Sequence, residues 1–374
     1  MARFTGTDAA DRILLDFLSP GVTSDPAGLT GTGGEFNLIY GGGGADYIQT
    51  YGGDVYGGSG NDSLFGGSSS DNLYGEDGSD RLNSGDAAAG FEFVNGGTGA
   101  DRMFGGEGLQ VYVVDSYDDV VKDFGTSAGE QQFGEDWDVS DSIVTDLNYK
   151  LSEKAGVEVL YLGMEQWGLP ATRKTVYGGG NSHDNFINGN EFGNVLEGFR
   201  GDDTLLGGAG RDLLLGGKGN DGIQGDDGND VVRGQDGADN VSGGAGKDKL
   251  IGGKGRDTFV FGVADESVKG ARDAIVAGDG AVAFEGAGAA AGDLIWMPNA
   301  PTADSPPEDH FVDDFGAFTF GGTGKGQVSC IDYGRNTLVR ANIDDDSSFE
   351  FELLIKDGAV RAHAYTADDF FLGP

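Results

Sequence analysis

The chain has 374 residues, of which 72 are glycine, and its formal net charge is −39. Glycine loses more backbone entropy on folding than any other residue, and excess charge of one sign opposes a compact state. The same acidity argues against a nucleic-acid partner, because phosphate binding uses lysine and arginine. The 23 phenylalanines and 12 tyrosines, however, are not typical of a disordered chain. We therefore expect folding to be conditional on cations that neutralise the carboxylates.

The N-terminal segment predicts no secretory signal peptide. Its apolar stretch, residues 13–18, is short, contains Asp16 and follows no basic region. No run in the chain approaches the roughly 20 apolar residues that a membrane span needs. Residues 6–14, GTDAADRIL, are a degenerate copy of a nine-residue repeat with Asp11 in the sixth position.

A first array of these repeats is expected over residues 1–113. Clear copies such as GGGGADYIQ and GGSGNDSLF begin at Gly41, Gly57, Gly66, Gly75 and Gly96. Their sixth positions are all aspartate: Asp46, Asp62, Asp71, Asp80 and Asp101. The copy that begins at Gly105 has Gln110 in this position.

Residues 114–180 interrupt the repeats. The segment DSIVTDLNYKL alternates apolar side chains from Ile143 to Leu151, which predicts a strand, and VEVLYL from Val157 predicts another. We expect wider coils of the same solenoid here, and a separate small β domain is the alternative.

A second array is expected over residues 181–260, and residues 198–260 read as seven nonapeptides without a register slip. The sixth position is aspartate in every copy: Asp203, Asp212, Asp221, Asp230, Asp239, Asp248 and Asp257. The eighth position is always apolar: Leu205, Leu214, Ile223, Val232, Val241, Leu250 and Phe259. A flexible glycine-rich linker has no reason to keep an apolar residue at every ninth position, so this pattern predicts a repeated fold.

The spacing dictates how such repeats pack. Glycines supply turns, and the three residues after each aspartate make a short strand with one inward side chain. Two nonapeptides then form a coil of 18 residues, and coils stack at the strand spacing of about 4.8 Å. Carboxylates and turn carbonyls from successive coils line up and repel one another unless a cation lies between them. Oxygen ligands in such flexible geometry suit calcium.

The motif resembles the calcium-binding nonapeptide of RTX (repeats-in-toxin) proteins. This resemblance implies an all-β fold, a right-handed parallel β-roll or β-solenoid, with several calcium ions bound between the turns of repeats two apart. It implies that the sixth-position aspartates of both arrays are ligands. Carbonyl groups of the turns would complete the sites, among them those of Gly208, Gly210, Gly217 and Gly219.

Residues 261–374 differ in composition and predict a C-terminal β cap. The alternating segments NTLVRANI and FEFELLI, which begin at Asn336 and Phe349, predict strands. This region resembles the end of serralysin-type RTX proteins, where the uncleaved signal for a type I secretion apparatus lies. The resemblance implies a secreted protein, extracellular or at the cell surface. Export also fits the charge, because the chain would stay unfolded until calcium outside the cell folds it.

No catalytic machinery is apparent. None of His183, His310 and His363 begins the zinc-protease motif HExxH. One GxSxG string surrounds Ser127, but it lacks the strand-to-helix context of a nucleophile elbow. The lone Cys330 allows no intramolecular disulfide and is typical of a buried small side chain. We therefore predict a protein that is not an enzyme.

The leading functional hypothesis is a structural one. Roll and cap account for the whole sequence, and open β-edges favour stacking, so we expect a self-assembling subunit of a surface layer, matrix or filament. The alternative is a calcium-dependent adhesin or glycan-binding protein that uses Trp137, Trp167 or Trp296. An enzyme with an unrecognised site is the least favoured hypothesis.

Overall fold

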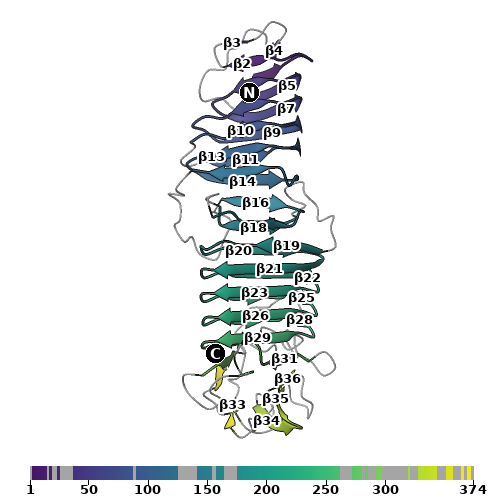
Figure 1. The fold of residues 1–374 in the computed structure, drawn as a ribbon, viewed down its shortest axis with the longest axis vertical. Coiled ribbons are helices and arrows are strands. Elements are labelled where there is room, and N and C mark those ends of the chain that lie inside the picture. The colour runs from purple at the N-terminus through teal and green to yellow at the C-terminus, as the bar shows by residue number, and fades with distance from the viewer. Residues whose placement is uncertain are drawn as a thin grey trace. The chain divides into compact units, whose positions relative to one another are not determined.

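The computed structural model describes residues 2–14, 17–18, 23–25, 37–86, 90–124, 141–153, 157–163, 175–261, 272–279, 281, 283–284, 292–296, 319–320, 327–342, 351–356, 364–365 and 369–371. The chain folds as two compact units, Met1–Arg173 and Lys174–Pro374. Within each unit, short strands stack into two mainly parallel sheets joined by tight turns (Figure 1). The described residues contain no α-helix, and therefore no helix that could cross a membrane. The predicted all-β parallel solenoid is confirmed.

Unit 1 holds two sheets. The strands of its first sheet are β1 (Ala2–Thr5), β4 (Thr23–Asp25), β5 (Asn37–Gly43), β7 (Gly53–Ser59), β9 (Asp71–Gly78), β11 (Phe91–Asn95), β12 (Thr98–Gly99), β14 (Leu109–Val114), β16 (Ser142–Thr145) and β18 (Val159–Leu162). The second contains β2 (Arg12–Leu14), β3 (Phe17–Leu18), β6 (Tyr47–Gln49), β8 (Ser63–Phe65), β10 (Arg81–Asn83), β13 (Arg102–Gly105) and β15 (Val120–Asp123). Neighbours pair in parallel, except that β4 and β3 pair antiparallel with β1 and β2.

Unit 2 repeats this arrangement. Its first sheet contains β20 (Phe186–Asn190), β22 (Thr204–Gly210), β24 (Gly222–Gln224), β25 (Asp227–Gly228), β27 (Asn240–Ser242), β28 (Ala245–Gly246), β30 (Thr258–Val260), β32 (Leu294–Trp296) and β37 (Phe370–Phe371). Its second contains β19 (Thr175–Gly179), β21 (Gly193–Arg200), β23 (Leu213–Lys218), β26 (Val231–Asp236), β29 (Lys249–Lys254), β31 (Ala274–Val276), β36 (Phe351–Lys356), β35 (Asn336–Asn342), β34 (Gln327–Tyr333) and β33 (Thr319–Phe320). The strands β34, β35 and β36 pair antiparallel.

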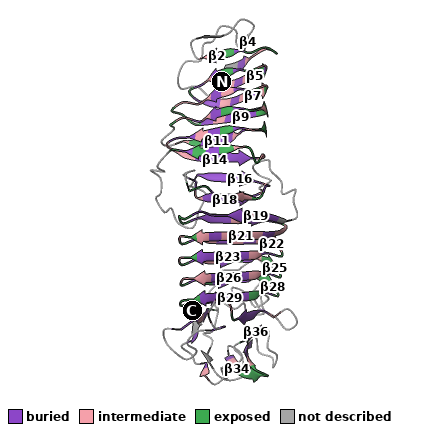
Figure 2. Ribbon diagram, in the orientation of Figure 1, coloured by how far each residue is buried: buried purple, intermediate pink, exposed green. Residues whose placement is uncertain are grey.

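The core consists of apolar columns, one per sheet. In unit 2 the eighth-position side chains pair in register, as in Leu205 with Ile223 and Leu214 with Val232. The eighth-position residues of all seven copies are buried, with at most 3% of each exposed. Figure 2 shows the alternation of buried and less buried residues along the strands. The inward position predicted for these side chains is confirmed.

The interrupting segment contributes β16 and β18 to the first sheet of unit 1, where they extend the parallel pairing of β14. The strand expected from Asp141 is wrong in one respect. It breaks after Thr145, and β17 (Tyr149–Lys150) is a separate element. A hydrogen bond from the Leu147 backbone to the Thr145 hydroxyl, 3.1 Å long, turns the chain at the break. The C-terminal strand predictions are confirmed by β35 and β36. The predicted alternation is incomplete, because Leu338 and Glu352 are buried together with their neighbours.

Candidate metal-binding rows

The sixth-position side chains form rows at the turns, each residue standing just before a strand or within its first two residues. Row 1 of unit 1 consists of Asp11, Asp46, Asp62, Asp80, Asp101 and Asp119. Row 2 consists of Asp71, Glu92, Gln110 and Asp141. Row 3 of unit 2 consists of Asn185, Asp203, Asp221, Asp239, Asp257 and Asp293. Row 4 consists of Asn194, Asp212, Asp230, Asp248 and Asp273.

In rows 1, 3 and 4, one carboxylate oxygen of most aspartates ties adjacent coils together. The backbone N–H of Asp203 donates to Oδ1 of Asp221 at 2.9 Å, and that of Asp221 donates to Oδ1 of Asp239 at 2.9 Å. In row 4 the N–H of Asp212 donates to Oδ1 of Asp230 at 2.8 Å. These bonds fix the carboxylate plane, so the position of the other oxygen is set by the backbone rather than by side-chain rotation.

The other oxygen, Oδ2, is buried and has no hydrogen-bond partner among the described residues. This holds for Asp46, Asp62, Asp80, Asp101, Asp203, Asp212, Asp221, Asp230, Asp239 and Asp248. A buried carboxylate oxygen without a partner costs free energy, because it has lost its hydration. A regular row of such oxygens is what a bound cation would satisfy.

The first glycine of each repeat leaves space beside this oxygen. A Cβ placed on Gly207 would lie 2.8 Å from Oδ2 of Asp212 and 2.5 Å from the carbonyl oxygen of Gly225. Only hydrogen fits there. The carboxylate oxygen and a carbonyl oxygen from the next coil therefore flank one small cradle, and both are ligands that calcium prefers.

Further carbonyl oxygens run along the turns. A Cβ on Gly228 would collide with the carbonyl oxygen of Gly210, and one on Gly237 with that of Gly219. Gly210 and Gly219 have φ angles of 129° and 131°, which favour glycine. Gly208 and Gly217, at φ 88° and 124°, occupy the second position of the same turns. All four residues thus lie beside the cradles, and their ligand role stays a prediction.

The second position keeps a left-handed backbone even without glycine. Glu76, Phe199, Asp226 and Gln235 have φ angles between 66° and 83°. Such a conformation costs about 1–2 kcal/mol for a residue with a side chain. The stack therefore imposes the turn conformation on the sequence, which is typical of a functional constraint on the backbone.

Burial shapes the electrostatics of the rows. It raises the pKa of Asp203 to about 8, an effect that the backbone N–H of Asn185 partly offsets. Burial likewise raises the pKa of Asp212, Asp230 and Asp239 to about 7. A divalent cation beside these groups would favour the ionised form instead, so metal binding and proton release are coupled.

The structure separates residues that the sequence placed in one series. Asp71 begins β9 of the first sheet, whereas Asp46, Asp62, Asp80 and Asp101 precede strands of the second. Row 1 is therefore an unbroken aspartate row, and row 2 contains Asp71 with Glu92 and Gln110. The two rows of unit 1 thus offer different donor sets.

Row 2 is partly closed by protein hydrogen bonds. The Gln110 amide donates to Oε2 of Glu92 at 2.8 Å. The fully buried Tyr112 donates from its hydroxyl to Oδ2 of Asp123 at 2.5 Å. The Tyr112 hydroxyl and Oδ2 of Asp123 occupy the space beside Gly105. Beside Gly207, the corresponding space holds Oδ2 of the sixth-position aspartate, Asp212. Burial, with its loss of hydration, raises the pKa of Glu92 to about 7.

Sequence reasoning missed several members of the rows. Asp119, Asp141, Asp273 and Asp293 accept the same backbone hydrogen bond as the motif aspartates, although none of them ends a complete GGxGxD motif. Their signal in the sequence is an apolar residue two positions later, as in the motif. Asn185 and Asn194 also lie in the rows, and counting back from residue 198 in steps of nine would have found them.

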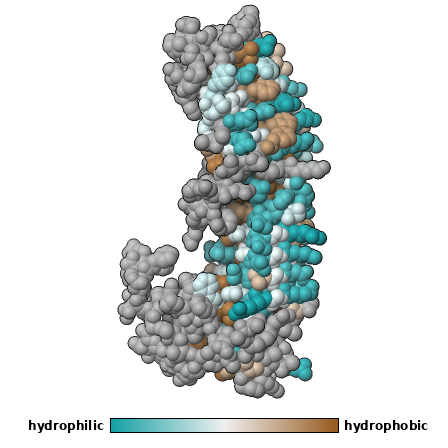
Figure 3. Space-filling view, turned by 90° about the vertical axis from the view of Figure 1, so that its left-hand side faces the viewer, coloured by the Kyte–Doolittle hydropathy of each residue, from teal (hydrophilic) through white to brown (hydrophobic). Residues whose placement is uncertain are grey.

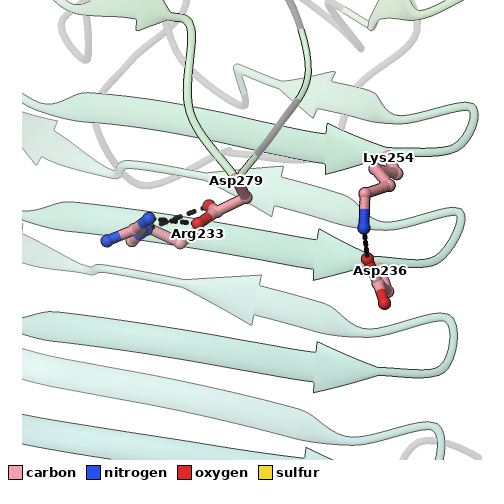
Figure 4. Close-up of polar contacts among 4 residues, drawn as sticks. All are labelled: Arg233, Asp236, Lys254 and Asp279. Atoms are coloured by element: carbon pink, nitrogen blue, oxygen red, sulfur yellow. Dashed lines mark hydrogen bonds and ion pairs between the residues drawn. The ribbon is translucent and has the colours of Figure 1, made fainter.

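Ion pairs among the described residues fasten the end of unit 2. Arg233 on β26 pairs with Asp279, and its Nε donates to Oδ2 at 3.0 Å (Figure 4). Lys254 pairs with Asp236 at 2.6 Å across neighbouring coils. The first pair holds the segment after β31 against the second sheet, where Ala274 and Val276 pack on Ile251.

The structure describes only some of the other residues singled out in the sequence. Burial raises the pKa of Cys330 to about 12, so it is a poor nucleophile. Trp296 is 36% exposed on β32. Ser127, Trp137, Trp167, His310 and His363 lie outside the described residues. In the described part of the chain, no three histidine, cysteine or acidic side chains converge as a metal-binding group. Each candidate site therefore combines carboxylate with backbone oxygens.

Comparisons with known proteins bear on both arrays. The model of the RTX calcium-binding nonapeptide repeat (4 copies) matches residues 32–54, 56–88, 86–108, 179–214, 188–223, 207–241 and 224–259. No curated protein matches the chain. A similar solved structure is the solution structure of the AlgE6R3 subunit from the Azotobacter vinelandii mannuronan C5-epimerase. It is 28% identical, and the match covers 44% of this chain and 78% of that chain with a TM-score of 0.29.

Proposed function

We propose that this chain, whose residues 32–54, 56–108 and 179–259 match the RTX calcium-binding nonapeptide repeat, is a secreted protein whose rolls fold when calcium binds. The observation that carries the proposal is the set of buried Oδ2 atoms without partners. Most of them lie beside both the first glycine of their repeat and the carbonyl oxygen of the next coil, as at Gly207. A calcium ion there would supply the missing partner and cancel the repulsion within the row.

The proposed ligands are the sixth-position aspartates together with turn carbonyls. Rows 1, 3 and 4 offer repeated carboxylates, and the carbonyl oxygens of Gly208, Gly210, Gly217 and Gly219 would complete sites in rows 3 and 4. Crystals grown in calcium and measured for anomalous scattering test this assignment. Ions between successive turns of a row support it, and ions bound only to exposed surface carboxylates would contradict it.

Export is the second part of the proposal. A type I secretion apparatus would pass the chain unfolded, and calcium outside the cell would then supply folding free energy. Secretion assays with a chain that lacks residues 261–374 test this idea. Unchanged export of the shortened chain would count against a C-terminal signal.

Outside the cell we propose a structural, non-enzymatic role in a surface layer, matrix or filament. Its support is that the described residues form stacked coils, since open strand edges favour association. Electron microscopy of the purified chain with and without calcium is the test. Calcium-dependent assemblies are expected, and a strictly monomeric calcium-loaded chain would rule out self-assembly. The alternative, a calcium-dependent adhesin or glycan-binding protein, is favoured by the surface described next.

A further inference from the structure

The outer side of the second sheet of unit 1 differs in charge from the acidic chain as a whole. Its inward column, which includes Ile48 and Leu64, is buried, and the side chains on either side of that column point outward. We call these outward side chains the cationic face. It comprises Arg12, Leu14, Tyr47, Gln49, Ser63, Phe65, Arg81, Asn83, Arg102, Phe104, Val120 and Lys122.

This face carries cations and no carboxylate. Arg12, Arg81, Arg102 and Lys122 lie on it, in a chain with 63 acidic and 24 basic residues. Arg81 and Arg102 pair in register on neighbouring strands, which places their backbones about 4.8 Å apart. Among the described residues, neither arginine has an ion-pair partner. Two adjacent like charges without a carboxylate are destabilising alone, so they point to an anionic partner.

Aromatic rings lie between the cations. Tyr47 and Phe65 have ring centroids 5.0 Å apart, and the guanidinium of Arg81 lies 4.7 Å from the centroid of Phe104. Phe104 also stacks on Phe124, which is 71% exposed. Figure 3 shows brown patches among teal side chains over unit 1, whereas the described surface of unit 2 is mostly teal and white.

We infer that the cationic face binds a linear polysaccharide that carries carboxylate groups, a polyuronate. Arginines at successive coils match carboxylates that repeat along a polymer, and guanidinium binds carboxylate through paired N–H groups. The rings offer apolar surface to the C–H faces of sugars. Gln49, Ser63 and Asn83 supply hydrogen-bonding groups for sugar hydroxyls.

Other anionic partners fit the face less well. Nucleic acid needs many phosphate contacts, and only four cations lie here within an otherwise acidic chain. A folded protein partner favours a desolvated apolar centre. Here the aromatic rings are shared with arginine side chains and spread along the coils instead. The regular columns of one residue per coil favour a partner that is itself a linear repeat.

The test is calorimetric titration of the full chain, loaded with calcium, with hyaluronan, which carries uronic acid. Neutral dextran and a single-stranded DNA oligonucleotide are the comparison ligands. The variant is Arg81→Glu with Arg102→Glu. The matched control is Lys247→Glu with Lys249→Glu, the same charge change at exposed positions of unit 2. Circular dichroism of every variant in calcium checks that the rolls are ordered.

We expect hyaluronan to bind, dextran not to bind, and the arginine variant to lose about tenfold or more in affinity. Added salt should weaken binding in the original chain more than in the variant. Equal loss in the lysine control, or tighter binding of DNA, would overturn the inference. Because the face exists only in the folded roll, the inference rests on the proposed function. A chain that orders in calcium but binds no hyaluronan refutes the inference alone, and a chain that does not order refutes both.

Discussion

Replacing Gly207 by alanine should weaken calcium binding in row 4, because the new methyl group would fill a cradle. Its carbon would lie 2.8 Å from Oδ2 of Asp212 and 2.5 Å from the Gly225 carbonyl oxygen, so these atoms must move apart. Overpacking of this kind costs about 1–3 kcal/mol. If only the calcium-bound form of the turn bears this cost, the affinity for calcium falls roughly 5- to 150-fold.

The matched control is Gly222→Ala, a substitution on the neighbouring strand β24. A Cβ there meets only the Thr204 hydroxyl at 3.9 Å and the Asp203 carbonyl oxygen at 4.0 Å. Alanine at this open strand position should be neutral or slightly stabilising. Calcium titrations followed by circular dichroism and calorimetry compare the two variants. Equal midpoints for Gly207→Ala and Gly222→Ala would refute the assignment of the cradle as a calcium site.

Three further predictions follow from the rows. Asp221→Asn keeps the oxygen that accepts the Asp203 backbone N–H but replaces Oδ2, so calorimetry should show lost or weakened calcium binding. The control Asp202→Asn, at an exposed turn position, should leave calcium binding unchanged, and equal effects of the two substitutions would contradict the ligand role. In chelator, carboxyls such as Asp203, whose pKa in the fold is about 8 against 3.8 ordinarily, stabilise the fold fully below about pH 3.8. That contribution falls as pH rises and is lost above about pH 7–8. Circular dichroism in EDTA should therefore show more β structure at about pH 5 than at about pH 8.5, and the reverse order would contradict the burial of these groups. Tyr112→Phe removes a hydrogen bond to the Asp123 carboxylate and should lower the free energy of unfolding by about 1.5–3 kcal/mol in a thermal melt. The number of calcium ions bound should not change, and the loss of an ion would show that row 2 holds metal beside Tyr112.

The regular parts of the fold follow from the sequence because the motif repeats without a break. An apolar eighth position every nine residues allows one register only, and Leu205, Ile223 and Val241 pair as that register requires. The start of each strand is set by the same count. The expectation of a bound cation follows too, since stacked ionised carboxylates repel one another unless a cation lies between them.

The arrangement of unit 1 could not be predicted in the same way. Its repeats are spaced irregularly, so the sequence does not show that Asp71 stands in a different row from Asp62 and Asp80. Glu92 joins the row of Asp71 through strand pairing alone. The division of the chain at residues 113, 180 and 260 stays a prediction.

The ends of the rows were missed for a physical reason. Asp273 and Asp293 continue rows 4 and 3 after long connections, and their carboxylates accept the backbone N–H groups of Asp248 and Asp257. A strand needs only its aspartate and one inward apolar residue to join the stack. A search for the complete GGxGxD motif passes over such copies.

Calcium titration of the pure chain, followed by circular dichroism and reversed with EDTA, tests the central claim most directly. Metal ions that bridge buried carboxylates should produce a cooperative transition from coil to β structure, which chelation undoes. A chain that shows the same β structure in EDTA at neutral pH as in saturating calcium would contradict the account.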